Sequence, residues 1–460
     1  MITWHSWNVD NLRRADAELR PVILQITSEI NRRCVDPRLT PDQQEAYTFE
    51  EIERNFLPVL VVAEERPDID MIFGSGTYPC LVVITPHGRV LKTLEPEMEQ
   101  DLYNPLLECR RTYINAGHTA GHAVVLPHYL FADLPAIPED FAQKGIEQLF
   151  QDANRFVSTM PAMMDASDST LYGQGDMLNF LVELGNARQD ESISELAGTC
   201  LNVLTATLWD PELGGYFLAK EKEHIIGVKK LSDQLDILEA LINFSEFDRA
   251  PAHQAITALR QSITANFYQE NGLFAFYSTS DAIGLENNFR YLALLAKGIR
   301  NALIADLSVN DITPIAQTLA NLQQANGTFP PLLHRSDSAP LLGVQSTAAI
   351  AFAEIATLCN DESWREKGLQ ALYPCFGSMW RTAGGCLGTT NTASEPLPPV
   401  CPLRENMLFA HACRLYRDGT MGENITTYRN QTLQIFMQNA FASFGAQRYC
   451  YGRELLFIGR

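Results

Sequence analysis

Asp210-Pro211-Glu212-Leu213-Gly214-Gly215-Tyr216-Phe217 follows an apolar helical run and combines a turn with two glycines and two aromatic residues. Four weaker versions of this loop begin at residues 270, 325, 383 and 444. The five starts are separated by 60, 55, 58 and 61 residues. Because two helices with their loops need about this length, the period predicts a series of helical hairpins.

The loops divide a region in which apolar residues recur with helical spacing and no convincing strand pattern occurs. The helical patterns run over 139–159, 175–187, 192–208, 231–247, 252–267, 288–305, 311–325, 344–359, 362–380, 403–416 and 424–442. A degenerate first unit, ending near Met160-Pro161-Ala162-Met163, precedes the five loops. We therefore expect residues 139–460 to be all-α.

The first 115 residues have a different pattern. Two short apolar runs rich in β-branched residues, 21–27 and 58–62, flank a helical segment and predict a βαβ unit with parallel strands. Two further runs, 81–84 and 90–94, flank a proline and glycine turn and predict a hairpin. A helix from about Pro96 to Tyr113 closes the unit. The order βαβ and then ββα predicts an α/β domain with a thioredoxin-like fold over residues 1–115.

The bulk composition is that of a globular protein with more than one domain: 460 residues, of which 46% are hydrophobic and 20% charged. The net charge of −20 argues against nucleic acid as a partner. No apolar run reaches the roughly 18 residues of a membrane span, and the N-terminus lacks the pattern of a signal peptide. We expect neither a transmembrane protein nor a cleaved leader.

The ten cysteines are scattered through the chain, and no Cys-x-x-Cys occurs among them. Such spacing is typical of buried free thiols in a reducing compartment, so we expect a cytoplasmic protein. No close pair of cysteines is present to start a zinc site. The sequence predicts no metal and no cofactor.

Three motifs in the first domain resemble a known family. Glu64-Glu65-Arg66-Pro67-Asp68-Ile69-Asp70 is followed by Gly76-Thr77-Tyr78-Pro79 and by Leu81-Val82-Val83-Ile84-Thr85-Pro86-His87-Gly88. These motifs, with Trp4 and Trp7, resemble the thioredoxin-like domain of spermatogenesis-associated protein 20 and its bacterial homologues. That family joins a thioredoxin-like domain to an α/α toroid.

The family's redox motif is missing from this sequence. The family carries Cys-x-x-Cys, within Cys-His-Trp-Cys-His, just after the first strand, where this chain has Ser28-Glu29-Ile30-Asn31-Arg32-Arg33-Cys34. Thiol–disulfide exchange needs an attacking thiolate and a resolving partner. Cys34 can attack, with neighbouring arginines lowering its pKa, but it has no local partner. Pro79 stands where thioredoxin-like folds place a cis-proline, so the shape of a binding site can persist without redox chemistry.

Arg66, in the centre of the heptad, has carboxylates on both sides in sequence. Pro67 holds it extended, and Asp68 is expected to cap the short helix that follows. We expect either a structural ion-pair loop at the edge of the sheet or a binding role for Arg66.

Residues 116–138, rich in small residues and prolines, are expected to be a linker between the domains. Within it, His118 and His122 have the i, i+4 spacing that can share a metal on a helix. Two glycines argue against a firm helix there, and no third ligand is evident. We expect solvated histidines and no metal.

The resemblance implies that the helical region is a ring of six hairpins, an (α/α)6 toroid as in many sugar-active enzymes. Closure of the ring removes the exposed terminal repeats that an open solenoid must cap. In such toroids the glycine-aromatic loops gather around one mouth. Their aromatic residues Tyr216, Phe217, Phe274 and Phe276 then either stack on a sugar or pack in the centre of the ring.

Acid–base chemistry on sugars needs paired titratable groups across a cavity. The carboxylates beside the loops are Asp210, Glu212, Asp233, Asp236, Glu239 and Glu286. The stretch 229–234 resembles the family's Lys-Met-Leu-Tyr-Asp-Asn, but the family's preceding His-Phe-Glu is replaced by Ile226-Gly227-Val228. Asp233, which is also in the position of a helix cap, and Glu286 remain as the candidate catalytic residues.

Three hypotheses about function follow. Both sites that carry chemistry in the family lack their main residues here, while the framework around them remains. We therefore expect first a non-catalytic protein that acts as a binding, assembly or scaffold factor for an unknown protein partner. The alternative is a carbohydrate-active toroid enzyme, a sugar isomerase, epimerase or hydrolase that uses other carboxylates on a small sugar. A thiol–disulfide oxidoreductase is the third hypothesis.

Overall fold

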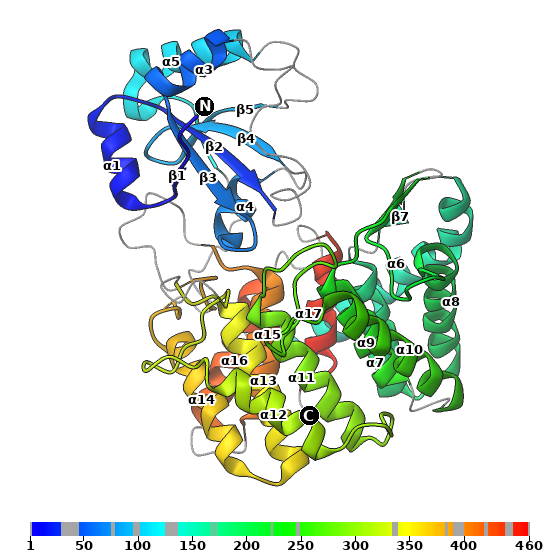
Figure 1. The fold of residues 1–460 in the computed structure, drawn as a ribbon. Coiled ribbons are helices and arrows are strands. Elements are labelled where there is room, and N and C mark those ends of the chain that lie inside the picture. The colour runs from blue at the N-terminus through cyan, green and yellow to red at the C-terminus, as the bar shows by residue number, and fades with distance from the viewer. Residues whose placement is uncertain are drawn as a thin grey trace. The chain divides into compact units, whose positions relative to one another are not determined.

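The structure, a computed structural model, divides the chain into two compact units. It describes residues 2–28, 46–74, 79–94, 102–124, 137–166, 169–170, 173–221, 224–244, 249–333, 339–381, 385–389, 400–417, 422–437 and 445–458. One unit, called here the sheet unit, comprises Met1–His128 and Gly388–Val400, and the other, the helical unit, comprises Tyr129–Leu387 and Cys401–Arg460. Figure 1 shows the elements of each.

The sheet unit is built on a mixed β-sheet. Its elements are β1 (His5–Ser6), α1 (Val9–Ala17), β2 (Val22–Thr27), α3 (Ala46–Asn55), β3 (Leu57–Val62), α4 (Pro67–Phe73), β4 (Cys80–Ile84), β5 (Arg89–Leu94), α5 (Tyr103–Ala116), the 3-10 turn η2 (Gly117–Thr119) and β6 (His122–Ala123). The strand order is β1-β3-β2-β4-β5-β6. Strands β2 and β3 are parallel, and β4 and β5 are an antiparallel pair. The predicted βαβ unit and the predicted hairpin are therefore confirmed. Residues 117–123, predicted as part of a linker, form η2 and β6 instead.

Alternation along the strands explains why helices cover both faces of the sheet. Leu24 and Ile26 point to one face, where they pack with residues of α1 and α4. Ile23 points to the other face, where it packs with residues of α3 and α5. Figure 1 shows these two pairs of helices on opposite sides of the strands. Continuous apolar runs are thus expected for strands that are buried on both faces.

The helical unit is an (α/α)6 toroid, as predicted. Its helices are α6 (Glu139–Ala166), α7 (Gln174–Arg188), α8 (Glu191–Leu208), α9 (Leu231–Phe244), α10 (Arg249–Phe267), α11 (Leu285–Arg300), α12 (Val309–Ala320), α13 (Leu342–Cys359), α14 (Glu362–Phe376), α15 (Leu403–Leu415), α16 (Gly422–Phe436) and α17 (Arg448–Leu455). Among the described residues, the odd-numbered helices contact one another in the order α7-α9-α11-α13-α15-α17 and back to α7. They form a closed inner ring, and the even-numbered helices pack outside it.

Three details differ from the predicted pattern. Helix α6 continues through Pro161 to Ala166, so no loop ends the first hairpin near residue 160. Helix α17 begins at Arg448, within the stretch predicted as the last loop. A small antiparallel sheet of β7 (Ser169–Thr170), β8 (Ala219–Glu221) and β9 (His224–Ile226) was not predicted. Strands of two or three residues are too short to leave an alternating pattern.

A repeated contact attaches the loops to the inner ring. Helices α9, α11, α13 and α15 each begin with leucine and carry a side-chain amide three residues later. Gln234 accepts a hydrogen bond from the Tyr216 backbone N–H (2.7 Å) and donates one to the Tyr216 carbonyl (2.8 Å). The same exchange joins Asn288 to Phe274, Gln345 to Phe329 and Asn406 to Cys386. These buried amides satisfy backbone groups that the tight loops leave without partners.

Helix α13 is the one described helix that is long and apolar enough to cross a membrane by length and composition. However, 72% of it is buried inside the protein, where it packs against α11, α14 and α15. The central helix of a soluble core passes the same test, so α13 is weak evidence for a membrane span.

Candidate active site

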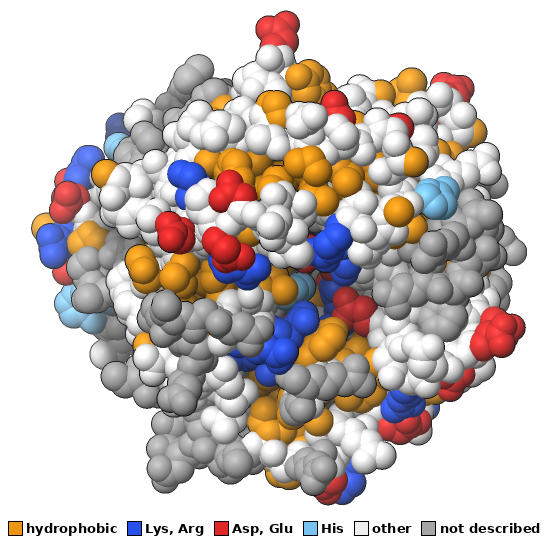
Figure 2. Space-filling view, turned by 90° about the horizontal axis from the view of Figure 1, so that it is seen from below, with side chains coloured by type: hydrophobic (Ala, Val, Ile, Leu, Met, Phe, Trp, Pro, Cys, Tyr) orange, Lys and Arg blue, Asp and Glu red, His pale blue; other side chains and the backbone are white. Residues whose placement is uncertain are grey.

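The inner ring encloses a charged cavity. Its lining comes from five of the six inner helices and comprises Asp176, Glu239, Glu286, Arg290, Arg404, Met407, Leu408, His411, Cys450, Arg453 and Glu454. The space-filling view shows a depression near the centre of one face in which acidic, basic and histidine side chains gather (Figure 2). Most of the lining is polar, so the centre of this ring is not a hydrophobic plug.

One part of the lining is a network of ion pairs. Arg290 Nη2 lies 2.5 Å from Asp236 Oδ1 and 2.7 Å from Glu239 Oε2. Arg453 Nη2 lies 2.5 Å from Glu239 Oε1 and 2.6 Å from Glu183 Oε1. Burial alone would raise the pKa of Glu239, but Arg453 and Arg290 outweigh it and hold this pKa well below its usual range. Glu239 is therefore a fixed anion, and the network holds α7, α9, α11 and α17 together.

Glu286 of this lining faces a second acid, Glu405, which is not itself a lining residue, over a glycine. A Cβ added to Gly343 in α13 would lie 2.4 Å from Glu286 Oε2 and 3.3 Å from Glu405 Cγ. Both side chains thus occupy the space that the glycine leaves free. Within the described part of the chain, neither Glu286 nor Glu405 makes an ion pair. Burial first, and then the negative charge of Glu286, raises the pKa of Glu405 to about 7.

Arg404 connects the ion-pair network with the two facing acids. Its Nη2 is 3.5 Å from Asp236 Oδ1 in the network. Its positive charge also acts on Glu405, where it opposes the rise in pKa, and on Glu286. Asp176, at the start of α7, has a pKa raised by burial and lowered in part by Arg404. Arg404 is therefore a cation that acts on both facing acids and also contacts the network.

His411 also lines the cavity. It lies on α15 seven residues, or about two helical turns, after Arg404. Burial, together with the positive charges of Arg414 and Arg453, holds the pKa of His411 well below its usual value. The imidazole is therefore neutral at pH 7 and can accept a proton or a hydrogen bond.

The acids predicted from the sequence lie in different environments in the structure. Glu286 lies in the cavity, as described. Asp233 is buried at the start of α9 and is not a lining residue of the cavity. Its Oδ1 accepts a hydrogen bond from Ser232 Oγ (3.1 Å), its Oδ2 has no partner among the described residues, and burial raises its pKa to about 6. Asp210 is occupied by an ion pair with Lys229 Nζ (2.7 Å) and by two backbone N–H groups. Glu212 is exposed on its loop.

The loop aromatics serve packing. Tyr216 and Phe274 are buried, with edge-to-face contacts to Trp209 and Tyr291 at ring centroid distances of 5.1 and 4.9 Å. The ring of Phe276 fills the space beside Gly284, where an added Cβ would lie 2.1 Å from it. Phe217 lies half-buried under Lys229, whose Nζ is 5.4 Å from the ring centroid. None of the four lines the charged cavity.

The candidate binding residues of the sheet unit that the structure describes are Arg66 and Pro79. Arg66 donates two hydrogen bonds to the Asp68 carboxylate, from Nε (2.9 Å) and Nη2 (2.7 Å). The expected cap by Asp68 is wrong, because the start of α4 has no side-chain cap hydrogen bond and the carboxylate pairs with Arg66 instead. Pro79 is half-buried just before β4. Cys34 lies outside the described residues.

The sequence reasoning missed Glu405, Arg404, His411 and Arg453. A signal for the first two was present, since Leu403-Arg404-Glu405-Asn406 repeats the leucine and amide spacing of Leu231-Ser232-Asp233-Gln234. Residues between that leucine and amide lie at the start of an inner helix, beside the cavity. His411 and Arg453 carry no such local signal.

Comparisons with known proteins agree with the helical fold. No family model and no curated protein matches the chain. Among solved structures, the chain is similar to a D-mannose isomerase, with a TM-score of 0.56 and 13% identity over 70% of this chain and 99% of that one. It is also similar to a sugar epimerase from a ruminal bacterium, with a TM-score of 0.52 and 9% identity over 65% and 90% of the two chains.

A third similar structure is an unsaturated glucuronyl hydrolase specific for heparin, with a TM-score of 0.51 and 10% identity over 69% of this chain and 96% of that one. At these identities the similarity establishes the fold. The expectation of a non-catalytic binding, assembly or scaffold factor is nevertheless wrong: the matching toroids are sugar enzymes. The absence of the His-Phe-Glu motif misled the reasoning, because the cavity carries its acids at other positions.

Proposed function

We propose that the helical unit is a carbohydrate-active enzyme that transfers protons on a small sugar, as an isomerase or epimerase. The observation that carries the proposal is the pair of facing acids, Glu286 and Glu405, with the pKa of Glu405 raised to about 7. An acid–base group works best when its pKa lies near the operating pH. The names of the similar isomerase and epimerase support this choice of chemistry.

The residues around the pair have complementary roles. Isomerisation or epimerisation next to a sugar carbonyl removes a proton from carbon and leaves negative charge on oxygen. One glutamate takes that proton, and Glu405, when protonated, supplies a proton to oxygen. The guanidinium of Arg404 stabilises the negative charge as it develops. The neutral imidazole of His411 lies deeper and is available as a further proton acceptor.

The size of the cavity limits where a sugar can bind. Its volume is about 50 Å³, which is room for only a few water molecules. A sugar ring therefore has to sit at the mouth of the ring of helices, with only its reacting end reaching the acids. This favours attack on one end of a mono- or disaccharide, and we propose its reducing end.

Glycoside hydrolysis is the second candidate. It needs two carboxyl groups on opposite sides of the bond, one of them with a raised pKa, and Glu286 with Glu405 also meets this description. The two reactions differ in their products, since only isomerisation and epimerisation exchange a carbon-bound hydrogen with solvent.

One experiment separates these reactions. The protein is incubated in D₂O with a panel of reducing mono- and disaccharides, and proton NMR follows the signal of the hydrogen next to the carbonyl. Loss of that signal with formation of a new sugar supports the proposal. Release of new reducing ends without exchange supports hydrolysis instead. No change in any sugar, with a protein that unfolds cooperatively, would refute both.

For the sheet unit, we propose a thioredoxin-like domain of a divergent member of the spermatogenesis-associated protein 20 family. The strand order and the heptad at residues 64–70 support this. We also propose a reducing compartment, which the free state of the nine described cysteines supports. Thiol titration of the denatured protein, isolated without reductant, is expected to give ten free thiols; a lower number would contradict the compartment.

A further inference from the structure

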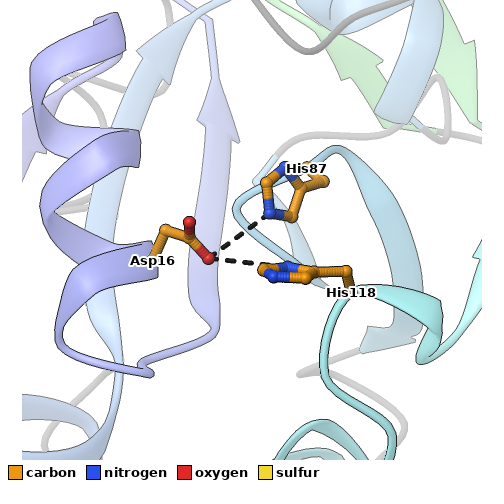
Figure 3. Close-up of side chains that lie close together, drawn as sticks. All are labelled: Asp16, His87 and His118. Atoms are coloured by element: carbon orange, nitrogen blue, oxygen red, sulfur yellow. Dashed lines mark ion pairs between the residues drawn. The ribbon is translucent and has the colours of Figure 1, made fainter.

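Three polar side chains from distant segments meet at one edge of the sheet unit (Figure 3). Asp16 lies in the last turn of α1, His87 in the turn between β4 and β5, and His118 in η2. Asp16 Oδ1 is 3.3 Å from His87 Nε2 and 3.6 Å from His118 Nδ1. The two imidazole rings meet edge to face, with their centroids 4.2 Å apart.

The spacing of these atoms is that of metal ligands. Zinc binds imidazole nitrogen at about 2.0–2.1 Å and carboxylate oxygen at about 2.0–2.2 Å, usually as a tetrahedron. Neighbouring ligand atoms in such a tetrahedron are then roughly 3.3–3.5 Å apart. The oxygen and the two nitrogens here all lie within 4.8 Å of one another. Small side-chain rotations are enough to bring them around one ion.

Two buried polar atoms at this place have no hydrogen-bond partner in the described structure. Asp16 Oδ1 is shielded from solvent and makes no hydrogen bond of acceptable geometry, although the two imidazoles lie nearby. The hydroxyl of Tyr113 is buried without a partner as well, and the charge of Asp16 acts on it. Unsatisfied buried polar groups are rare and costly in native proteins. A cation held by Asp16 would remove the first of these costs.

The turns that carry the two histidines are fixed to each other by Arg89. Its Nε donates to the carbonyl of Ala120 (3.0 Å), and its Nη2 donates to that of Gly121 (2.7 Å). The Arg89 backbone in turn closes the turn of His87 through Thr85, whose N–H donates to the Arg89 carbonyl (2.8 Å). Both imidazoles are therefore positioned by backbone that is held independently of any ligand, as in preorganised metal sites.

We propose that Asp16, His87 and His118 form a binding site for Zn²⁺ in the sheet unit, with water as the fourth ligand. Two imidazoles and one carboxylate suit zinc, whereas Mg²⁺ and Ca²⁺ prefer oxygen ligands alone. The ion joins the end of α1, the β4–β5 turn and η2, which are separated in sequence by 71 and 31 residues. It acts as a structural clip and is independent of the chemistry proposed for the helical unit.

The structure separates the two histidines whose spacing the sequence analysis noted. His118 and His122 have helical spacing, but they lie on η2 and on β6, so they do not share a helix face. The partners of His118 come from the distant positions 16 and 87. His122 is exposed on its strand and outside the cluster, which makes it a matched control.

The test uses the full-length protein and Zn²⁺ alone. Binding is measured by calorimetry and by competition with a chromophoric chelator, and Co²⁺ is used to report the ligands by its visible spectrum. The wild type is expected to bind one ion at this site, with no sulfur-to-cobalt charge-transfer band. The variants His87→Ala, His118→Ala and Asp16→Asn are each expected to lower the affinity at least roughly tenfold, whereas His122→Ala leaves it unchanged.

A thermal readout checks the same claim. Because an ion that binds only the folded state stabilises it, Zn²⁺ is expected to raise the melting temperature of the wild type and of His122→Ala but not of His118→Ala, while Mg²⁺ raises none. His118 is 63% exposed, so its replacement does not threaten folding. Wild-type affinity in the His87 and His118 variants, a sulfur band with cobalt, or no zinc binding at all would each overturn the proposal.

Discussion

The two sets of acids inside the ring differ in their partners. Glu239 is held between Arg290 and Arg453, with each carboxylate oxygen in an ion pair. Glu286 lines the same cavity and Glu405 follows the lining residue Arg404. Each has the other acid across the space above Gly343 and no ion-pair partner within the described chain. Glu239 therefore stays ionised, whereas Glu405 can gain or lose a proton near neutral pH.

This difference distinguishes an acid that holds helices together from an acid that can transfer protons. A buried acid with two arginines stays ionised at any working pH, so it contributes to holding helices and cannot exchange protons. Glu405 is buried and faces another acid, and the two effects raise its pKa to about 7. Proximity to the centre of the ring is therefore a poor guide to catalytic role, whereas the absence of a counter-charge is a good one.

The largest expected effect is on turnover, from removing the titrating acid. Glu405→Gln keeps the size and the hydrogen-bonding ability of the side chain but cannot transfer a proton. Loss of an acid–base group typically lowers the rate by about 10²–10⁴-fold, and we expect that loss in kcat for the sugar found in the NMR screen. The paired control is Glu212→Gln, at an exposed glutamate, which is expected to keep full activity. Equal rates in the two variants would contradict the role of Glu405.

The next effect is on stability, from breaking the paired set. Arg453→Met leaves Glu183 without an ion-pair partner among the described residues and leaves Glu239 with Arg290 alone. Removing one partner of a buried ion pair costs about 3–5 kcal/mol, which urea denaturation of the helical unit measures. Lys144→Met, which breaks an exposed pair with Asp140 on α6, is expected to leave the midpoint unchanged. A urea midpoint for Arg453→Met equal to that of the control would show that the ion-pair network does not contribute to stability.

A smaller and more selective change is Gly343→Ala. The added Cβ would lie 2.4 Å from Glu286 Oε2, so this flexible side chain has to move away from position 343 and its spacing to Glu405 changes. Misplacing a reacting group by about 1 Å can cost roughly 10²-fold in rate, while alanine in place of a helical glycine gains up to about 1 kcal/mol of stability. We expect turnover to fall by roughly 10–100-fold and the melting temperature to stay or rise.

Gly227→Ala is the matched control for this change, because a Cβ at Gly227 meets nothing within 4 Å. It is expected to keep the wild-type rate. Unchanged turnover in both alanine variants would mean that the spacing of Glu286 and Glu405 does not matter for the reaction.

The fold could be predicted because its signals are local. The apolar, β-branched run at residues 21–27 and the loop period near 60 residues reflect contacts made within one strand or one hairpin. The site depends on ring closure, which brings the starts of α11 and α15 together although they are more than 100 residues apart. Glu286 was found because it follows a glycine-aromatic loop. The raised pKa of its partner Glu405 arises from burial inside the closed ring and from Glu286 across it, and no local pattern records either cause.

The smallest effect is the pH dependence of stability, and its sign differs between the two sets. The pKa of Glu405 rises from 4.5 to about 7 on folding, so between these values the folded state holds a proton that the unfolded state has lost. This contribution to stability is complete below pH 4.5 and is lost as the pH rises to 7, by up to about 1.4 kcal/mol per pH unit. The lowered pKa of Glu239 acts oppositely, giving stability that is present above pH 4.5 and lost below it.

Urea midpoints in half-unit steps from pH 4.5 to 7.5 are expected to fall less steeply in Glu405→Gln than in the wild type. The loss of stability in Glu239→Gln, relative to the wild type, stays constant over this range. Parallel curves for wild type and Glu405→Gln would mean that Glu405 is solvated like an ordinary surface acid, and the facing pair would then lose the property that distinguishes it from the network.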